Sequence, residues 1–440
     1  MMNFKRIPLL LLAVLLCSTL HSQQKWSLAE CIVYARENNL QVKQQMIAIG
    51  QAENNLLSAK MDYIPSLNAS MSHNMSWGRS VNLNDLEIIE NQLSQSTSLS
   101  LSASVPVFEG MRKHNTVKSN IKQLEIAGTN VEKLKDEISI AVAQAYLQVL
   151  LNKEIEKSAL QSCKSVEKQV ERCRELVEAG SQAYSSLLEI QAQLANERVQ
   201  LVNAGNNVRS SLLNLAQMLD LENFEEFDIV IPDIEPLIAE PEETDMEKIY
   251  GNALSLPRIR GAELALEQSK LQYKIQKGAA LPTISFNAGY GTYYSDNQQT
   301  AFFEQFNNNR NPSMGFGLSI PIFNNWRNNT AIRNARLNVK NSELELKIQH
   351  QGLMKDIQQA CNDAKACYEK LNASQENLSA AKESFKYTEE KFNAGMVSGT
   401  DYTVAKTNLT KSESEYIQSK FQYVFQLKVL DYYRNIPLTL

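Results

Sequence analysis

Histidine and acidic side chains are the groups that could perform chemistry in this chain, but their spacing is not that of an active site. None of the four histidines is paired with another ligand at metal-binding spacing. No Gly-x-Ser-x-Gly turn and no phosphate-binding glycine loop occurs. The sequence therefore predicts no enzyme, no cofactor and no metal site. The histidines are His21, His73, His114 and His350.

The six cysteines favour packing over chemistry. Cys361 and Cys367 belong to one predicted helix but face different sides of it, so they do not form a metal pair. Cys163 and Cys367 fall at core positions and are expected to pack as small apolar residues rather than as disulfide partners. The pairing of the cysteines after Cys17 stays open, but their odd number predicts at least one free thiol.

Asp401 is the acidic residue that we single out as a candidate pore gate. It follows Gly395 at the start of a predicted helix. An acid in the first turn is stabilised by the helix dipole by about 0.3–1 kcal/mol, so one interpretation is a helix cap alone. If three copies surround one axis, three Asp401 carboxylates would instead form a ring that favours cations. Ser186 at the equivalent place in the first half and Val404 one turn on are not acidic, so any ring would be single.

Two Ala-Gly pairs, Ala179-Gly180 and Ala394-Gly395, mark the ends of predicted helices. Glycine adopts a positive φ that costs other residues roughly 1 kcal/mol or more, so it commonly ends a helix. The two pairs therefore predict two sharp tips, at each of which one helix ends and a second turns back along it.

A long run without proline leads to the second tip. Residues 326–392 carry apolar side chains at alternating steps of four and three, which is the seam of a coiled coil. At about 1.5 Å per residue this helix would be roughly 100 Å long. A second proline-free run, residues 401–433, returns from the tip. The seam positions are Leu353, Ile357, Ala360, Ala364, Cys367, Leu371, Ser374, Leu378, Ala381 and Phe385.

The same arrangement occurs twice. Residues 105–108, Val-Pro-Val-Phe, match residues 320–323, Ile-Pro-Ile-Phe, and the same offset superimposes Gly180 on Gly395. A period this long indicates a duplicated architecture rather than a solenoid of small repeats. Four residues are expected where an outgoing strand turns into its long helix, namely Pro106, Phe108, Pro321 and Phe323.

The duplication sets the domain boundaries. Each repeat begins with a short helix and continues through a strand pair into a long helical hairpin. A linker rich in proline and acidic residues, 221–245, joins the repeats. The first repeat is residues 23–220, with strands at about 66–107 and the hairpin at about 111–220; the second is residues 246–440, with strands at about 283–321 and the hairpin at about 326–433.

Residues 1–22 have the features of a secretory signal peptide. Lys5 and Arg6 precede an apolar core, residues 7–16, which is too short to span a bilayer as a helix. A retained anchor is the alternative. Cys17 could accept a lipid, but Leu16 occupies the position where a lipoprotein signal has a small residue. We therefore expect export, with a new N-terminus near Gln23.

Four segments alternate apolar residues with small polar ones, as strands with one face toward lipid would. No stretch after the signal reaches 18 consecutive apolar residues, so no transmembrane helix is expected. A soluble sheet packed on one face is the alternative, but none of the four apolar faces carries a charge. The apolar positions are Leu67, Ala69, Met71, Met75, Trp77, Leu99, Leu101, Ala103, Val105, Val107, Ile284, Phe286, Ala288, Tyr290, Met314, Phe316, Leu318 and Ile320.

Four strands cannot close a barrel, and open edges in hydrocarbon would leave backbone N–H and C=O groups unpaired at several kcal/mol each. The chain is therefore expected to pool its strands with copies of itself. Two copies would leave an interior filled by side chains, and three copies, with twelve strands, make the smallest barrel with an open bore. The connectors, residues 78–94 and 292–311, are expected to be polar outward-facing loops.

The charge balance excludes one class of partner. The chain has 49 Asp and Glu against 44 Lys and Arg, with no basic cluster. A nucleic-acid partner is therefore not expected.

Taken together, the paired strand-to-helix turns, the paired tips and their constant spacing resemble the TolC-like outer-membrane efflux protein family. The resemblance covers nearly all of the mature chain. Asn325 replaces a glycine common after the second turn, and Ser186 replaces an acid often found after the first tip. The segments that carry it are Val-Pro-Val-Phe-Glu-Gly (105–110), Ile-Pro-Ile-Phe-Asn-Asn (320–325), Val-Glu-Ala-Gly (177–180) and Phe-Asn-Ala-Gly (392–395).

This resemblance implies an internally duplicated α+β membrane protein. Each chain would contribute four strands to a 12-stranded trimeric outer-membrane barrel, continued by an α-helical coiled-coil barrel in the periplasm. It also implies a passive exit duct of a tripartite efflux or type I secretion system. The tips Ala179, Gly180, Ala394 and Gly395 would dock a periplasmic adaptor of an inner-membrane pump, or serve only as helix caps.

A second function class fits the same helices. A periplasmic coiled-coil scaffold with a small soluble sheet would be an interaction protein without a pore. The uncharged apolar strand faces favour the channel.

Overall fold

Two helical hairpins and one antiparallel sheet account for most of the fold. The computed structural model describes residues 25–81, 87–221, 225–238 and 245–440, so the predicted signal peptide lies outside the described part. The chain forms two units, which we call the helical unit and the sheet unit. The helical unit comprises the described residues of Met1–Gln45, Asn130–Pro257 and His350–Leu440, and the sheet unit those of Met46–Thr129 and Arg258–Gln349.

The two hairpins share one design. Helix α4 (Arg112–Glu178) is followed by α5 (Tyr184–Met218), and α9 (Arg327–Asn393) is followed by α10 (Gly399–Tyr433). The heptad seam predicted for α9 is buried or half-buried throughout; Leu353 and Ile357, for example, are 1% and 0% exposed. Packing of this apolar stripe, rather than helix propensity alone, stabilises helices in water.

The N-terminal helix of the helical unit begins at a reciprocal cap. Helix α2 (Leu28–Asn38) starts after Ser27, whose Oγ accepts from the Glu30 backbone N–H at 3.3 Å. The Glu30 carboxylate accepts from the Ser27 backbone N–H at 2.8 Å, which completes a capping box. Two orphan N–H groups are thereby satisfied. The face of α2 that carries Cys31 and Ala35 is fully buried.

A buried tyrosine ties the segment before α2 to the linker between the repeats. Trp26 pairs with Ile229 in an isolated parallel bridge. The Tyr146 hydroxyl can donate a hydrogen bond to the carbonyl oxygen of Trp26, 3.1 Å away, or to that of Val230, 2.7 Å away. Burial is the main cause of the raised pKa of Tyr146.

The linker also makes an ion pair beside this bridge, between Asp228 and Lys153. The described parts of the linker also include η2 (Glu235–Leu237), and α6 (Met246–Ala253) follows it.

The sheet unit contains four antiparallel strands in the order β1-β2-β3-β4. The pairing register places one set of alternating side chains on each face. One face is small and polar: Ser70 faces Ser100 and Ser72 faces Ser98, each pair with hydroxyl oxygens 2.7 Å apart. The strands are β1 (Ser66–Val81), β2 (Ile88–Glu109), β3 (Thr283–Ser295) and β4 (Asn311–Ser319).

The opposite face is apolar and exposed in the single chain. Met314 is 83% exposed, Phe316 75%, Trp77 74% and Met71 70%. A sheet packed on its apolar face would have buried these side chains. This exposure is not what the soluble-sheet alternative predicts for the single chain.

The two connectors differ from the expected polar loops. The prediction of a loop over residues 78–94 was wrong, because β1 continues to Val81 and β2 begins at Ile88, with a register shift between Gly78 and Ser80. Residues 292–311 contain the end of β3 and a short helix, α8 (Phe302–Asn308). In the described parts of these segments, backbone groups are satisfied by strand pairing in the first and by polar side chains in the second. The composition of the segments alone did not reveal this.

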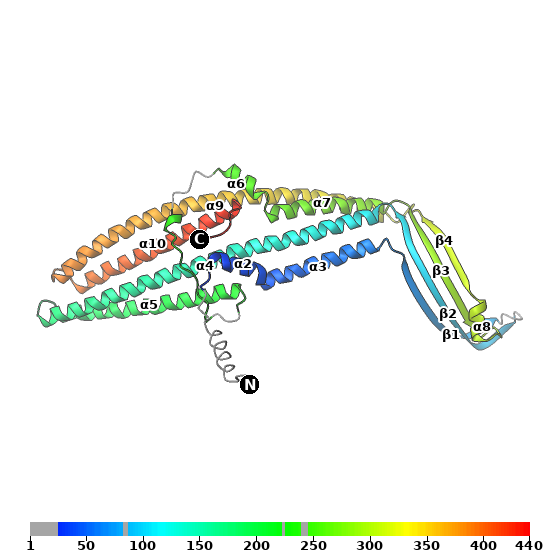
Figure 1. Ribbon diagram of the computed structural model, residues 1–440, viewed down its shortest axis with the longest axis horizontal. Helices are drawn as coiled ribbons and strands as arrows, with labels where there is room; N and C mark the ends of the chain where they lie inside the picture. The colour runs from blue at the N-terminus through cyan, green and yellow to red at the C-terminus, as the bar shows by residue number, and fades with distance from the viewer. Residues whose placement is uncertain (1–24, 82–86, 222–224, 239–244) are drawn as a thin grey trace, which may run out of the picture. The chain divides into compact units, whose positions relative to one another are not determined.

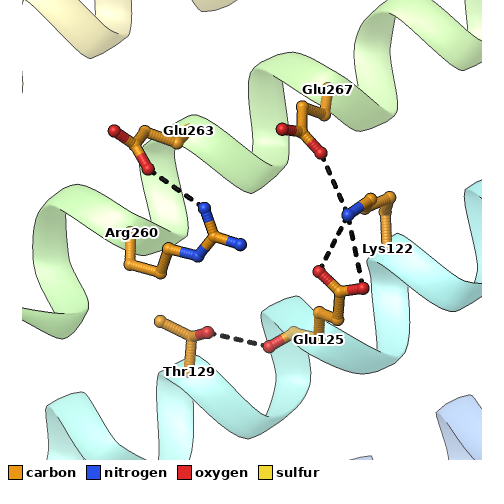
Figure 2. Close-up of polar contacts among 6 residues, drawn as sticks. All are labelled: Lys122, Glu125, Thr129, Arg260, Glu263 and Glu267. Atoms are coloured by element: carbon orange, nitrogen blue, oxygen red, sulfur yellow. Dashed lines mark hydrogen bonds and ion pairs between the residues drawn. The ribbon is translucent and has the colours of Figure 1, made fainter.

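Two incoming helices precede the strand pairs. Helix α3 (Leu40–Met61) leads to β1, and α7 (Pro257–Gly278) leads to β3 (Figure 1). Within the sheet unit, Lys122 of α4 lies 3.0 Å from Glu267 of α7 and 3.0 Å from Glu125 (Figure 2). Hydrogen bonds to Glu125 and then Glu267 raise the pKa of Lys122. This ion pair is one of several polar contacts between α7 and α4.

Candidate functional site: the helical tips

The first tip closes by a double backbone turn. Gly180 has φ +73°, donates its N–H to the Val177 carbonyl at 3.0 Å, and is followed by Ser181, which donates to the Leu176 carbonyl at 2.8 Å. This 5→2 and 6→1 pair is the Schellman motif. It requires the left-handed conformation that glycine adopts without strain.

The second tip repeats this geometry. Gly395 has φ +71°, its N–H donates to the Phe392 carbonyl at 3.0 Å, and the Met396 N–H donates to Lys391 at 2.9 Å. The duplication seen in the sequence is thus preserved in hydrogen-bonding detail. Ala179 and Ala394 follow directly after the last residues of α4 and α9, and their N–H groups donate to the carbonyls of Glu175 and Glu390.

Amide side chains join the two tips within the helical unit. Gln182 Nε2 donates to the Phe392 carbonyl at 2.8 Å, and Gln169 Nε2 donates to Asn393 Oδ1 at 3.0 Å. Beneath them, the fully buried Tyr402 ring contacts Phe392 at 5.1 Å between centroids. The tips are therefore held as one assembly by both polar and aromatic contacts.

Asp401 serves as the helix cap that its position predicted. Its Oδ2 accepts from Ser398 Oγ at 2.8 Å and from the Ser398 N–H at 3.1 Å, while Ser398 Oγ accepts from the Asp401 N–H. These hydrogen bonds lower the pKa of Asp401, so the carboxylate is ionised near neutral pH. Asp401 is exposed in the single chain.

Buried polar side chains near the tips escaped the sequence analysis. Glu197 is 4% exposed; its Oε1 accepts from Gln193 Nε2 at 2.7 Å, and its Oε2 has no partner in the described structure. Lys406 is 5% exposed and lies over the Phe385 ring at 5.2 Å. Burial raises the pKa of Tyr402, and Glu389 and Glu197 add to that shift. The signal in the sequence is a charged residue at a position where the helix faces the core, namely Glu197 in α5 and Lys406 in α10.

The predicted strand-to-helix turns lie partly inside a strand. Pro106 and Phe108 flank a register shift within β2, which continues to Glu109. Pro106 thus lies shortly before the end of β2, where the register shift accommodates a residue that lacks an N–H. Pro321 and Phe323 do follow the end of β4, and Phe323 is 74% exposed. Asn325 and Trp326 both have positive φ, as Gly110 and Met111 do at the equivalent positions, so Asn325 takes the left-handed conformation that glycine holds in the first turn.

Among the described residues, no group of three His, Cys, Asp or Glu side chains could hold a metal ion. Within the same part of the chain, no helix has the length and apolar character to cross a membrane. The cysteines that the structure describes, Cys31, Cys163, Cys173, Cys361 and Cys367, are free thiols.

Comparison with known proteins gives a family and a fold. A family model described as "Outer membrane efflux protein" matches residues 31–220 and 252–431, one match for each repeat. No protein with a curated function matches the sequence. Similar solved structures include CusC, which is 17% identical with a TM-score of 0.77, 95% of this chain and 96% of CusC being covered.

Two further structures agree. The Campylobacter jejuni CmeC outer membrane channel is 16% identical with a TM-score of 0.77. The match covers 92% of this chain and 85% of the CmeC chain. The outer membrane protein VceC of Vibrio cholerae is 15% identical with a TM-score of 0.74 and covers 92% of this chain and 95% of its own. At these identities the likeness shows the fold.

Proposed function

Because the chain belongs to the outer membrane efflux protein family, we propose that three copies form one passive duct across the outer membrane. Family membership places the strands in the outer membrane and the long helices in the periplasm. The observation that carries the proposal is the open four-stranded sheet. Strands β1 and β4 end the sheet, each with an unpaired edge, while the apolar face is exposed.

Pairing β4 of one copy with β1 of the next removes both free edges at once. Three copies of a four-stranded sheet give the twelve strands expected for a barrel with an open bore. The serine-lined face would then surround water, and the face carrying Met71 and Phe316 would meet lipid. Backbone groups in hydrocarbon would all be satisfied, which is the condition for a spanning β-structure.

The tips are proposed to dock the periplasmic adaptor of an inner-membrane pump. Exposed apolar side chains gather on the first turns of the return helices and in the turn at the second tip: Tyr184 is 65% exposed, Leu188 49%, Met396 76% and Val404 56%. The hydrogen bonds that the glutamine side chains make between the tips hold these apolar side chains on a preformed surface. Apolar groups held on rigid turns suit protein docking, because little conformational entropy is lost on binding.

Asp401 is proposed to belong to a carboxylate ring at the periplasmic mouth. The support is its exposure, its lowered pKa and its use of only Oδ2 in the cap hydrogen bonds. Three ionised groups around one axis would attract cations and repel one another, so the ring would favour cation passage.

The test of the duct is assembly together with conductance. The mature protein should leave membranes only in detergent, have the mass of a trimer by light scattering, and open aqueous pores in planar bilayers. A monodisperse monomer that stays soluble without detergent would refute the duct and leave a periplasmic scaffold.

A further inference from the structure

Helix α8 replaces strand pairing at the outer end of β3. Gln305 is 1% exposed; its Oε1 accepts from the Ser295 N–H at 2.9 Å and its Nε2 donates to the Ser295 carbonyl at 3.0 Å. Asn309 Nδ2 donates to the Tyr293 carbonyl at 2.8 Å. Strand β4 pairs with β3 only as far as Gly291, so these amides satisfy the edge that β4 leaves free.

The aromatic side of α8 leans onto the apolar face of the sheet. Thr292 Oγ1 donates to the Phe306 carbonyl at 2.7 Å, and the Tyr294 ring contacts Phe302 at 4.8 Å. Side chains along β3 point alternately to the two faces of the sheet, so Thr292 and Tyr294 lie on the same face as Ala288 and Tyr290. The helix therefore extends the apolar face rather than the serine-lined face.

The register fixes how far along the strands α8 lies. Tyr294 pairs with Thr97, which pairs with His73, so α8 joins the sheet before the level of Trp77. Trp77 is exposed on the apolar face. The ion pair between Arg79 and Glu90 lies beyond it. Helix α8 thus joins the sheet inside the level of the Arg79–Glu90 pair, at the outer end of the apolar band, although Asp296 and Glu304 place charge beside it. Figure 1 draws α8 at the end of β3 away from α7.

Phe303 is left without cover at this level. It is 85% exposed, although it packs edge-on against Phe302 at 5.4 Å. Phe302 in turn stacks on Phe306 at 4.6 Å. Three phenylalanines on one short, anchored helix form an aromatic cluster whose outermost member faces away from the sheet.

We propose that α8 is an interfacial anchor whose Phe303 ring inserts into the outer leaflet at the boundary between headgroups and acyl chains. The occupant of this surface is lipid, because the surface is continuous with the lipid-facing side of β3 and lies inside the level of the Arg79–Glu90 pair. Aromatic rings gather at such boundaries in membrane proteins. Anchoring here would fix the depth of the barrel by a helix rather than by a strand. The inference rests on the lipid-facing orientation of the strands in the proposed duct.

Tryptophan fluorescence in lipid vesicles tests the anchor. A reference protein carries Trp26→Phe, Trp77→Phe and Trp326→Phe, which removes the three native tryptophans. Single tryptophans are then placed as Phe303→Trp, as Glu304→Trp on the exposed neighbour turned by about 100°, and as Met71→Trp on the strand face. Vesicles contain brominated phospholipids, and iodide in the buffer reports water exposure.

Phe303→Trp and Met71→Trp should both lose at least about half of their emission with brominated lipid, whereas Glu304→Trp should respond mainly to iodide. Quenching of Phe303→Trp by iodide alone would overturn the anchor and leave a solvated loop. Protection of Phe303→Trp from both quenchers would overturn it too, because a neighbouring copy would then cover the ring. If Met71→Trp is also unquenched by lipid, the lipid-facing strands of the proposed duct fail rather than α8 alone.

Discussion

Gly110 and Gly278 press their backbones together where the sheet unit joins its helices. A Cβ added to either glycine would lie 2.5 Å from the carbonyl oxygen of the other, a distance that real Cβ atoms essentially never show. Gly110 follows β2, and Gly278 ends α7 just before β3. The contact therefore sets how closely the end of β2 and the segment that leads into β3 approach each other.

Gly278→Ala should destabilise the protein by about 1–3 kcal/mol, because the clash is with backbone and not with a flexible side chain. The measurement is the thermal unfolding of the purified protein in detergent, followed by circular dichroism. Gly128→Ala is the matched control, since a Cβ at Gly128 in α4 meets nothing within 4 Å. That control should be neutral or slightly stabilising by helix propensity. Equal effects of the two alanines would contradict the close-approach argument.

Gly395→Val should abolish export while trimer yield stays normal, because a β-branched residue cannot adopt φ +71° without strain and the docking surface would be distorted. Gly395→Asn is the matched variant and should retain most export, since asparagine tolerates the left-handed conformation. The measurements are transport in cells that depend on this channel and the amount of trimer on native gels. Normal export by Gly395→Val would reduce the tips to simple caps.

Asp401→Asn should lower the cation selectivity of the pore and relieve block by a trivalent cation, because the amide keeps a cap acceptor but removes the charge. Ser398→Ala should weaken the cap and leave selectivity unchanged, since the carboxylate remains. Reversal potentials in planar bilayers under a salt gradient measure both. If Asp401→Asn conducts like the unaltered channel, the carboxylate is a cap and the gate lies elsewhere.

The capping box of α2 predicts a stability that depends on acid. Hydrogen bonds from the Ser27 backbone and side chain lower the pKa of Glu30 below its ordinary 4.5. A lowered folded pKa gives a stabilisation that is present above the unfolded value and is lost as pH falls through the folded value. Glu30→Gln should therefore reduce the melting temperature at pH 7, and the difference should shrink below about pH 4. A difference that is constant down to pH 3 would contradict this linkage.

Glu197→Gln should stabilise the protein by about 1 kcal/mol, because it replaces a buried carboxylate that has one unpaired oxygen with a neutral amide. Glu167→Gln is the control, since Glu167 is half-exposed and paired with Arg198 at 2.9 Å; it should change stability little. Denaturant titration in detergent compares them. Destabilisation by Glu197→Gln would mean that this carboxylate finds a partner only in the assembled protein.

Much of this architecture could be predicted because it is repeated. The matched tips, the heptad seam of α9 and the period-two alternation each rest on local chemistry, and Leu353, Gly395 and Met71 fulfil their expected burial, φ and exposure. Helix α8 could not be predicted, since the edge that Gln305 caps exists only after β3 and β4 have paired. The same is true of Glu197, whose burial depends on packing between helices distant in sequence.

The unpaired edges of β1 and β4 also bear on biogenesis. Until another copy arrives, each newly exported chain presents two strand edges and an exposed apolar face to water, which are templates for wrong association. In the proposed duct, completing the sheet requires other copies of the chain, so the productive step depends on concentration whereas the hazard begins at once. Slow synthesis should therefore lower the yield of folded protein by more than the rate of synthesis falls. Periplasmic chaperones that bind unfolded chains should matter most when few copies of the chain are present.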